Sequence, residues 1–101
     1  MLIQQGDVLL KEAEHIPNNW TKLETNIIHK GLNHIHAIEG DFQIYDHQGT
    51  IYIRANSECL LNHDEHGKAD RILRTLPKGT YIKSIVKEYD HWLEESKEVV
   101  D

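Results

Sequence analysis

The chain of 101 residues has room for one domain, 1–101, and not for two. Its single cysteine, Cys59, excludes an intrachain disulfide and a cluster of thiolate zinc ligands. The net charge of −6 with scattered basic residues disfavours direct nucleic-acid binding. The N-terminal segment lacks the features of a signal peptide or membrane span, so we expect a cytoplasmic protein with no membrane contact.

Short alternating segments between turn residues predict a mainly β protein. The turns recur about every 8 to 12 residues, which is typical of a small β-barrel or β-sandwich of seven or eight short strands. The segments expected to be extended, in chain order, are 7–11, 21–28, 32–39, 41–45, 50–55, 58–62, 69–76 and 80–89.

Three boundaries are marked by specific residues. The turn 46–49 places Gly49 where a left-handed residue is needed, which predicts a hairpin with a bulge. Pro77 presets the backbone for a turn before Gly79. Asp90 is a suitable N-cap, and the apolar spacing after it predicts a short C-terminal helix.

Histidine is the main chemical signal, because the chain contains eight histidines and one cysteine. Alternate residues of a strand share a face, so His34 and His36 point the same way, together with Leu32 and Ile38. Two imidazoles at this spacing can share a metal ion. The remaining histidines are expected to be surface residues or weaker candidates, apart from the pair His63 and His66.

The motif His63-x-x-His66 lies in a polar segment that ends at Gly67, which we interpret as a loop able to curl around an ion. The predicted metal ligands are therefore His34, His36, His63 and His66. The ion would be a divalent transition metal such as zinc, iron, nickel or manganese. Further groups near these histidines are Glu39, Asp64 and Glu65, as ligands or as partners that orient an imidazole, and His29 as a weaker candidate.

A second interpretation of the same residues involves no metal. His34 and His36 would line a strand face and hydrogen-bond to neighbours, while His63 and His66 would be solvated loop residues. Nucleophilic catalysis has little support, because the three serines lack a strained glycine-flanked turn and Cys59 reads as a buried apolar residue. No catalytic residue is assigned.

The pattern His34-x-His36, followed by Glu39 and later by Pro77-x-Gly79, resembles part of the cupin motif. The resemblance implies a small double-stranded β-barrel that holds a metal with inward His and Glu side chains. Ile82 stands where the second cupin motif has a histidine, so His63 or His66 would replace that ligand.

Several segments are also similar to small accessory proteins of phages and bacteria. This resemblance implies a short single-domain protein and carries no activity with it. The segments are Gln5-Gly6-Asp7-Val8-Leu9, His34-x-His36, His63-x-x-His66-Gly67, Leu76-Pro77-x-Gly79-x-Tyr81 and Glu88-Tyr89-Asp90.

The first functional hypothesis is thus a histidine-rich β protein that binds a divalent transition metal. The alternative is an acidic interaction protein or inhibitor that binds a host protein, without metal or catalysis; its basis is the net charge of −6 and the acidic C-terminal segment. A third hypothesis is a protein that forms homo-oligomers through its sheet edges.

Overall fold

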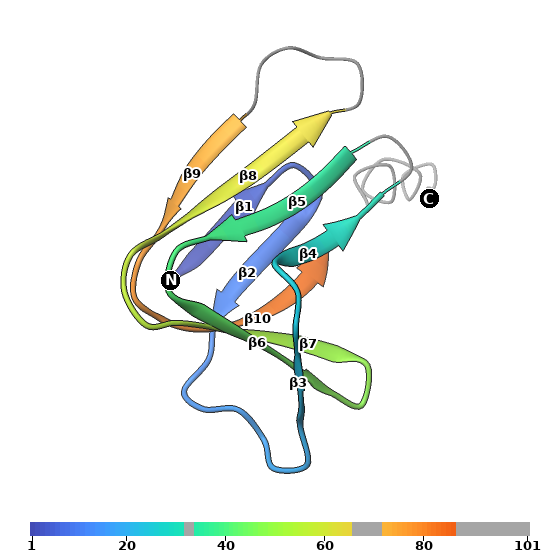
Figure 1. The fold of residues 1–101 in the computed structure, drawn as a ribbon, viewed down its shortest axis with the longest axis vertical. Helices are drawn as coiled ribbons and strands as arrows, with labels where there is room; N and C mark the ends of the chain where they lie inside the picture. The colour runs from blue at the N-terminus through green and yellow to red at the C-terminus, as the bar shows by residue number, and fades with distance from the viewer. Residues whose placement is uncertain (32–33, 66–71, 87–101) are drawn as a thin grey trace, which may run out of the picture.

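The structure is a computed structural model that describes residues 1–31, 34–65 and 72–86. The described part is built from strands, which confirms the expected mainly β class, and it contains no helix (Figure 1). The C-terminal helix expected after Asp90 lies outside the described residues. The strands are β1 (Leu2–Gln5), β2 (Val8–Glu12), β3 (Thr21–Leu23), β4 (Ile27–Lys30), β5 (His34–Glu39), β6 (Phe42–His47), β7 (Thr50–Ala55), β8 (Cys59–Glu65), β9 (Ile72–Leu76) and β10 (Gly79–Ile85).

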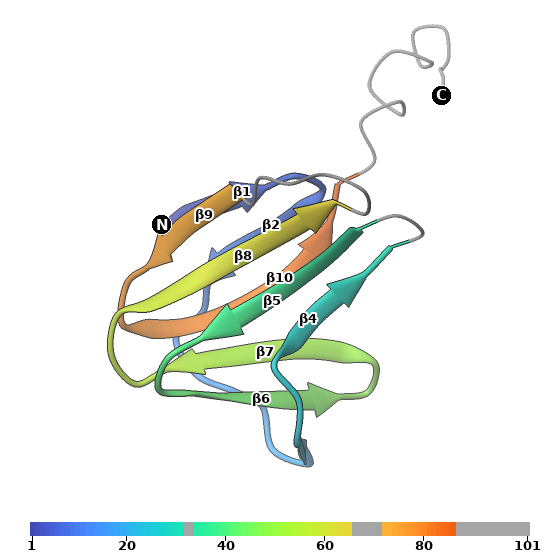
Figure 2. The same ribbon diagram turned by 45° about the horizontal axis from the view of Figure 1, so that its top comes forward.

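The strands form two antiparallel sheets that do not close into a single barrel. The six-stranded sheet has the order β1-β2-β10-β7-β6-β3, and the four-stranded sheet has the order β4-β5-β8-β9. In Figure 2 the four-stranded sheet lies in front of β1, β2 and β10. Side chains also join the sheets, since Gln5 Nε2 donates to Leu61 O at 3.1 Å and Arg74 donates to Gln4 O at 3.3 Å. Among the described residues no helix is long and apolar enough to cross a membrane.

The chain passes from one sheet to the other several times. The segment 21–28, expected as one strand, is divided between β3 in the larger sheet and β4 in the smaller one. Likewise β9 and β10 flank Pro77 but belong to different sheets. The buried Tyr81 supports this corner, because its hydroxyl donates to Pro77 O at 2.7 Å.

Two hairpin turns differ from the expectation in detail. The loop between β6 and β7 consists of Gln48 and Gly49 only, with φ of 53° and 87°. Two positive φ values are typical of a type I′ turn without a bulge. At the N-terminus β1 pairs with β2 through a turn of Gly6 and Asp7, so Asp7 is a turn residue rather than the start of a strand.

The core lies between the two sheets and is formed by alternate apolar residues. Leu10, Ile38, Ile53 and Leu76 are at most 1% exposed, and they come from four different strands. Burying each such side chain contributes about 2 kcal/mol to the stability of the fold. The buried His36 and His63 extend this inner layer toward the turn of the β1–β2 hairpin.

Candidate metal centre

Three predicted histidines meet on the inner face of the four-stranded sheet. His34 and His36 project from β5 on the face that also buries Ile38, as the alternation predicts. His63 lies directly opposite His36 in the β5–β8 ladder. The two rings are stacked, with centroids 4.1 Å apart and an interplanar angle of 18°.

The loop expected around His63 is in fact the end of a strand. β8 continues to residue 65, and its inner face carries Cys59, Leu61 and His63. His66 lies outside the described residues. The structure therefore brings together three of the four predicted ligands.

The acidic residues expected near the cluster have other positions. Glu39 and Asp64 are exposed on the outer face of the sheet. Glu39 accepts a hydrogen bond from Asn62 Nδ2 and does not orient an imidazole. The Glu65 side chain lies outside the described part.

A bulge in β4 adds His29 to the cluster. Ile27 pairs with Ala37 and His29 pairs with His36, so two steps along β4 match one step along β5. Such an extra residue changes the face to which the following side chain points. Both Ile28 and His29 are thereby turned inward, and the His29 and His36 ring centroids lie 6.0 Å apart.

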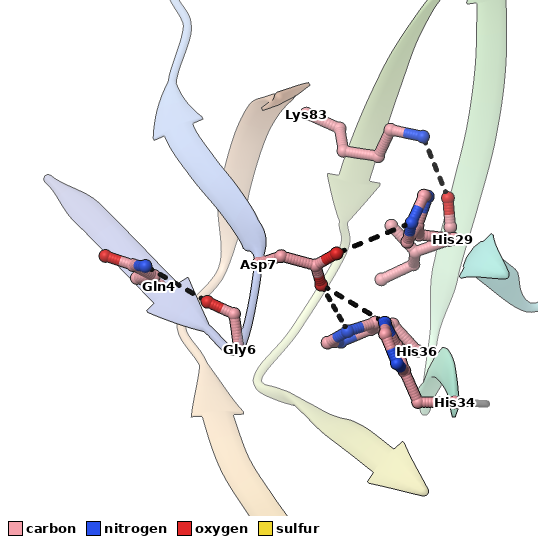
Figure 3. Close-up of polar contacts among 8 residues, drawn as sticks. Gln4, Gly6, Asp7, His29, His34, His36 and Lys83 are labelled. Atoms are coloured by element: carbon pink, nitrogen blue, oxygen red, sulfur yellow. Dashed lines mark hydrogen bonds and ion pairs between the residues drawn. The ribbon is translucent and has the colours of Figure 1, made fainter. Parts of the chain in front are cut away.

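The carboxylate of the cluster comes from the other sheet. Asp7 points from the β1–β2 turn toward the imidazoles of β4 and β5 (Figure 3). Its Oδ1 lies 3.1 Å from His36 Nε2 and 3.4 Å from His34 Nε2, and its Oδ2 lies 3.8 Å from His29 Nε2. The interpretation of the sequence missed Asp7, because a polar residue after glycine is ordinary in a turn.

Two glycines allow this close approach. A Cβ atom on Gly6, whose φ is 60°, would lie 2.8 Å from His63 Cε1 and 3.2 Å from His36 Cε1. A Cβ atom on Gly31 would lie 2.7 Å from His34 Nε2. The turn is also held by Gln4, whose Nε2 donates to Gly6 O at 3.0 Å. The backbone of the turn is therefore packed directly on the imidazoles.

Several imidazole nitrogens are buried without a hydrogen-bond partner in the described part of the chain. They are Nδ1 of His36, both ring nitrogens of His63, and Nε2 of His34, which has only the 3.4 Å ion-pair contact with Asp7. His36 is 1% exposed and His63 is 9% exposed. A buried polar atom without a partner costs about 1–3 kcal/mol, so a ligand that bonds to these nitrogens would stabilise the cluster.

The environment keeps His36 and Asp7 in the protonation states in which they can bind a metal ion. Burial, followed by the neighbouring His63, lowers the pKa of His36 from 6.5 to about 4. Burial and the charge of Lys83 lower the pKa of His29. For Asp7, burial acts to raise the pKa, but its own backbone N–H and the three imidazoles together lower it. At neutral pH His36 is therefore a neutral imidazole and Asp7 is a carboxylate.

Two overlapping groups of side chains have ligand atoms within 4.8 Å of one another. One is His34, His36 and His63, and the other is Asp7, His29 and His34. The first group is formed by adjacent strands of one sheet. The second group joins the two sheets through Asp7.

Residues 4–85 match a family model described as a domain of unknown function, DUF8820. The chain belongs to this family. The match covers all five residues of the cluster in this DUF8820 domain, namely Asp7, His29, His34, His36 and His63. No curated protein and no solved structure matches the chain.

Proposed function

We propose that this DUF8820 domain binds a divalent transition metal ion through His34, His36 and His63. The observation that supports the proposal is the convergence of three imidazoles, each of which has at least one buried nitrogen without a hydrogen-bond partner in the described residues. An ion would bind one nitrogen of each ring and remove the desolvation cost of that nitrogen. Buried histidines with a purely structural role would be expected to hydrogen-bond to their neighbours.

The donor set indicates which ions fit. Three imidazoles and a nearby carboxylate suit zinc, iron, nickel or manganese better than ions that require thiolates. Ligand atoms around a tetrahedral ion with bonds of about 2.0–2.1 Å lie about 3.3 Å apart. Asp7 Oδ1 lies 3.4 Å from His34 Nε2, which is close to that spacing, whereas its 3.1 Å contact with His36 Nε2 is a hydrogen bond.

One side of the cluster is buried and the other side is partly exposed, so a bound ion would be accessible to solvent. His36 and His63 form the buried base, whereas the side chains of His29, His34 and Asp7 are 23%, 28% and 34% exposed. A bound ion would thus keep a solvent-facing side, and water at that position would permit hydrolytic or oxygen chemistry. His66 as a further ligand, the cupin-like character, the cytoplasmic location and the relation to phage accessory proteins stay predictions.

Calorimetric titration of the untagged, chelator-stripped protein with Zn²⁺ tests the proposal. Replacing His34, His36 or His63 by alanine should weaken binding at this site at least about 100-fold. His15→Ala is the matched control, because His15 is exposed and lies outside the cluster. A His36→Ala protein that binds Zn²⁺ with unchanged affinity and stoichiometry would contradict the proposed site.

A second candidate function, association with another protein, is favoured by one observation. The outer face of the four-stranded sheet exposes Ile27, Ile35, Leu60 and Leu73, which are 37–57% exposed. Exposed apolar groups on one face are typical of an interface. With a second copy of the chain as the partner, sedimentation velocity should show a dimer that Leu60→Asp and Leu73→Asp dissociate. A monomer at all concentrations would contradict this function.

A further inference from the structure

The two oxygens of the Asp7 carboxylate face different sets of imidazoles. Oδ1 faces His34 and His36 at 3.4 and 3.1 Å, and Oδ2 faces His29 at 3.8 Å (Figure 3). A carboxylate with ligand groups beside each oxygen has the arrangement of a bridge between two ions. A carboxylate that served one ion would need only one of these sides.

His29 is not one of the three ligands, His34, His36 and His63, of the metal ion already proposed, which is called the first ion. The three histidines of the proposed site form a complete group without it, and His29 instead belongs to the group with Asp7 and His34. The Nε2 lone pair of His34 can bind one ion at a time. If His34 serves the first ion, His29 and Asp7 remain as protein ligands for another, and water completes its coordination.

We infer that the cluster holds a second divalent transition metal ion beside Asp7 and His29, with the Asp7 carboxylate shared between the two ions. The inference rests on the proposed function, because the first ion occupies His34, His36 and His63. The second position lies on the more exposed side of the cluster. An ion at this position could therefore bind a water molecule or an anionic ligand from solvent.

Lys83 makes the affinities of the two metal positions unequal. Its ammonium group donates to Ile28 O at 3.1 Å, on the side of the cluster where His29 lies (Figure 3). Burial, followed by the positive charge of Lys83, lowers the pKa of His29, so the two groups interact. A cation beside His29 is repelled by this charge. The second ion is therefore bound more weakly and fills its position after the first.

Equilibrium dialysis of the chelator-stripped full chain against increasing Zn²⁺, with bound metal counted by mass spectrometry, tests the inference. We expect two equivalents with separate affinities for the wild-type protein and for His15→Asn. His29→Asn should bind one equivalent, with the affinity of the tighter position changed less than about threefold. Asp7→Asn should also lose the weaker equivalent. Near-UV circular dichroism shows that each variant is folded before it is counted.

Lys83→Met provides an independent test, because it removes the repelling charge without removing a ligand. The weaker equivalent should then bind severalfold more tightly, and an unchanged affinity would overturn the placement beside His29. Two equivalents in His29→Asn would also overturn it. Saturation of the wild type at one equivalent, lost in His36→Ala, would overturn the second ion and leave the proposed function intact. No bound metal at any concentration would overturn both.

Discussion

His36 of β5 and His63 of β8 lie directly opposite each other, with their rings stacked 4.1 Å apart. Two imidazoles can stack so closely in a buried place only when at least one is neutral, because two buried positive charges would repel each other strongly. The β5–β8 register therefore places two rings so that at least one of them is held neutral. Neutral imidazole is also the form that binds a metal ion.

The stability of the metal-free protein should depend on pH through His36. Its pKa is about 4 in the folded protein and 6.5 when unperturbed, so the unfolded chain binds more protons between these values. The free energy of unfolding should therefore fall as the pH is lowered from 6.5 to 4, by about 2 kcal/mol from this group at pH 5. Urea unfolding at pH 7.5 and 5 measures the loss. His36→Leu should lose less stability than the wild type over this range, and equal losses would contradict the assignment.

Replacement of His63 by leucine should affect stability and metal binding in opposite directions. Both ring nitrogens of His63 are buried without hydrogen-bond partners in the described residues. An apolar side chain of similar volume should make the metal-free protein about 1 kcal/mol more stable. The same change should abolish tight Zn²⁺ binding. Urea midpoints and calorimetry measure the two effects, and destabilisation by about 2 kcal/mol or more would show that the imidazole is needed for folding.

Gly6→Ala should disturb both the fold and the site. The added Cβ meets His63 at 2.8 Å, and alanine is strained at φ 60°. Gly49→Ala is the matched control, because Gly49 also lies in a hairpin turn with positive φ but a Cβ there meets nothing within 4 Å. Both variants should lose about 1–2 kcal/mol from backbone strain. Only Gly6→Ala should also weaken Zn²⁺ binding, by about tenfold or more. Equal Zn²⁺ affinities in the two variants would show that the turn at Gly6 does not contribute to the metal site.

Tyr81→Phe should destabilise the fold and leave the metal site unchanged. The Tyr81 side chain is fully buried, and its hydroxyl donates to Pro77 O at the corner between the two sheets. Loss of this hydrogen bond should cost about 1–2 kcal/mol. Urea unfolding and Zn²⁺ titration of the variant measure both quantities. A large fall in Zn²⁺ affinity would mean that affinity follows overall stability rather than the named ligands.

Part of the site could be predicted from local pattern. The period of two along a strand places His34 and His36 on one face with Ile38, and the structure has this arrangement. The same period continues through Cys59, Leu61 and His63. The polar run after Asn62 resembles a loop, so the strand was expected to end at Asn62, three residues before its end in the structure.

The rest of the site depends on contacts between segments that are distant in sequence. His29 joins the cluster only because of the bulge at Ile28, and no local pattern marks that extra residue. Asp7 reaches the histidines from the other sheet, across 29 positions of sequence from His36. The division of 21–28 between two sheets is likewise set by packing rather than by propensity.

Elemental analysis by inductively coupled plasma mass spectrometry tests whether the histidine cluster binds a metal ion. The untagged protein is purified without chelator, measured, stripped, reloaded and measured again. We expect at least one equivalent of zinc, iron, nickel or manganese per chain, and we expect the His36→Ala variant to lose it at a low concentration of free metal. No metal in either preparation of the folded protein would contradict metal binding by the cluster.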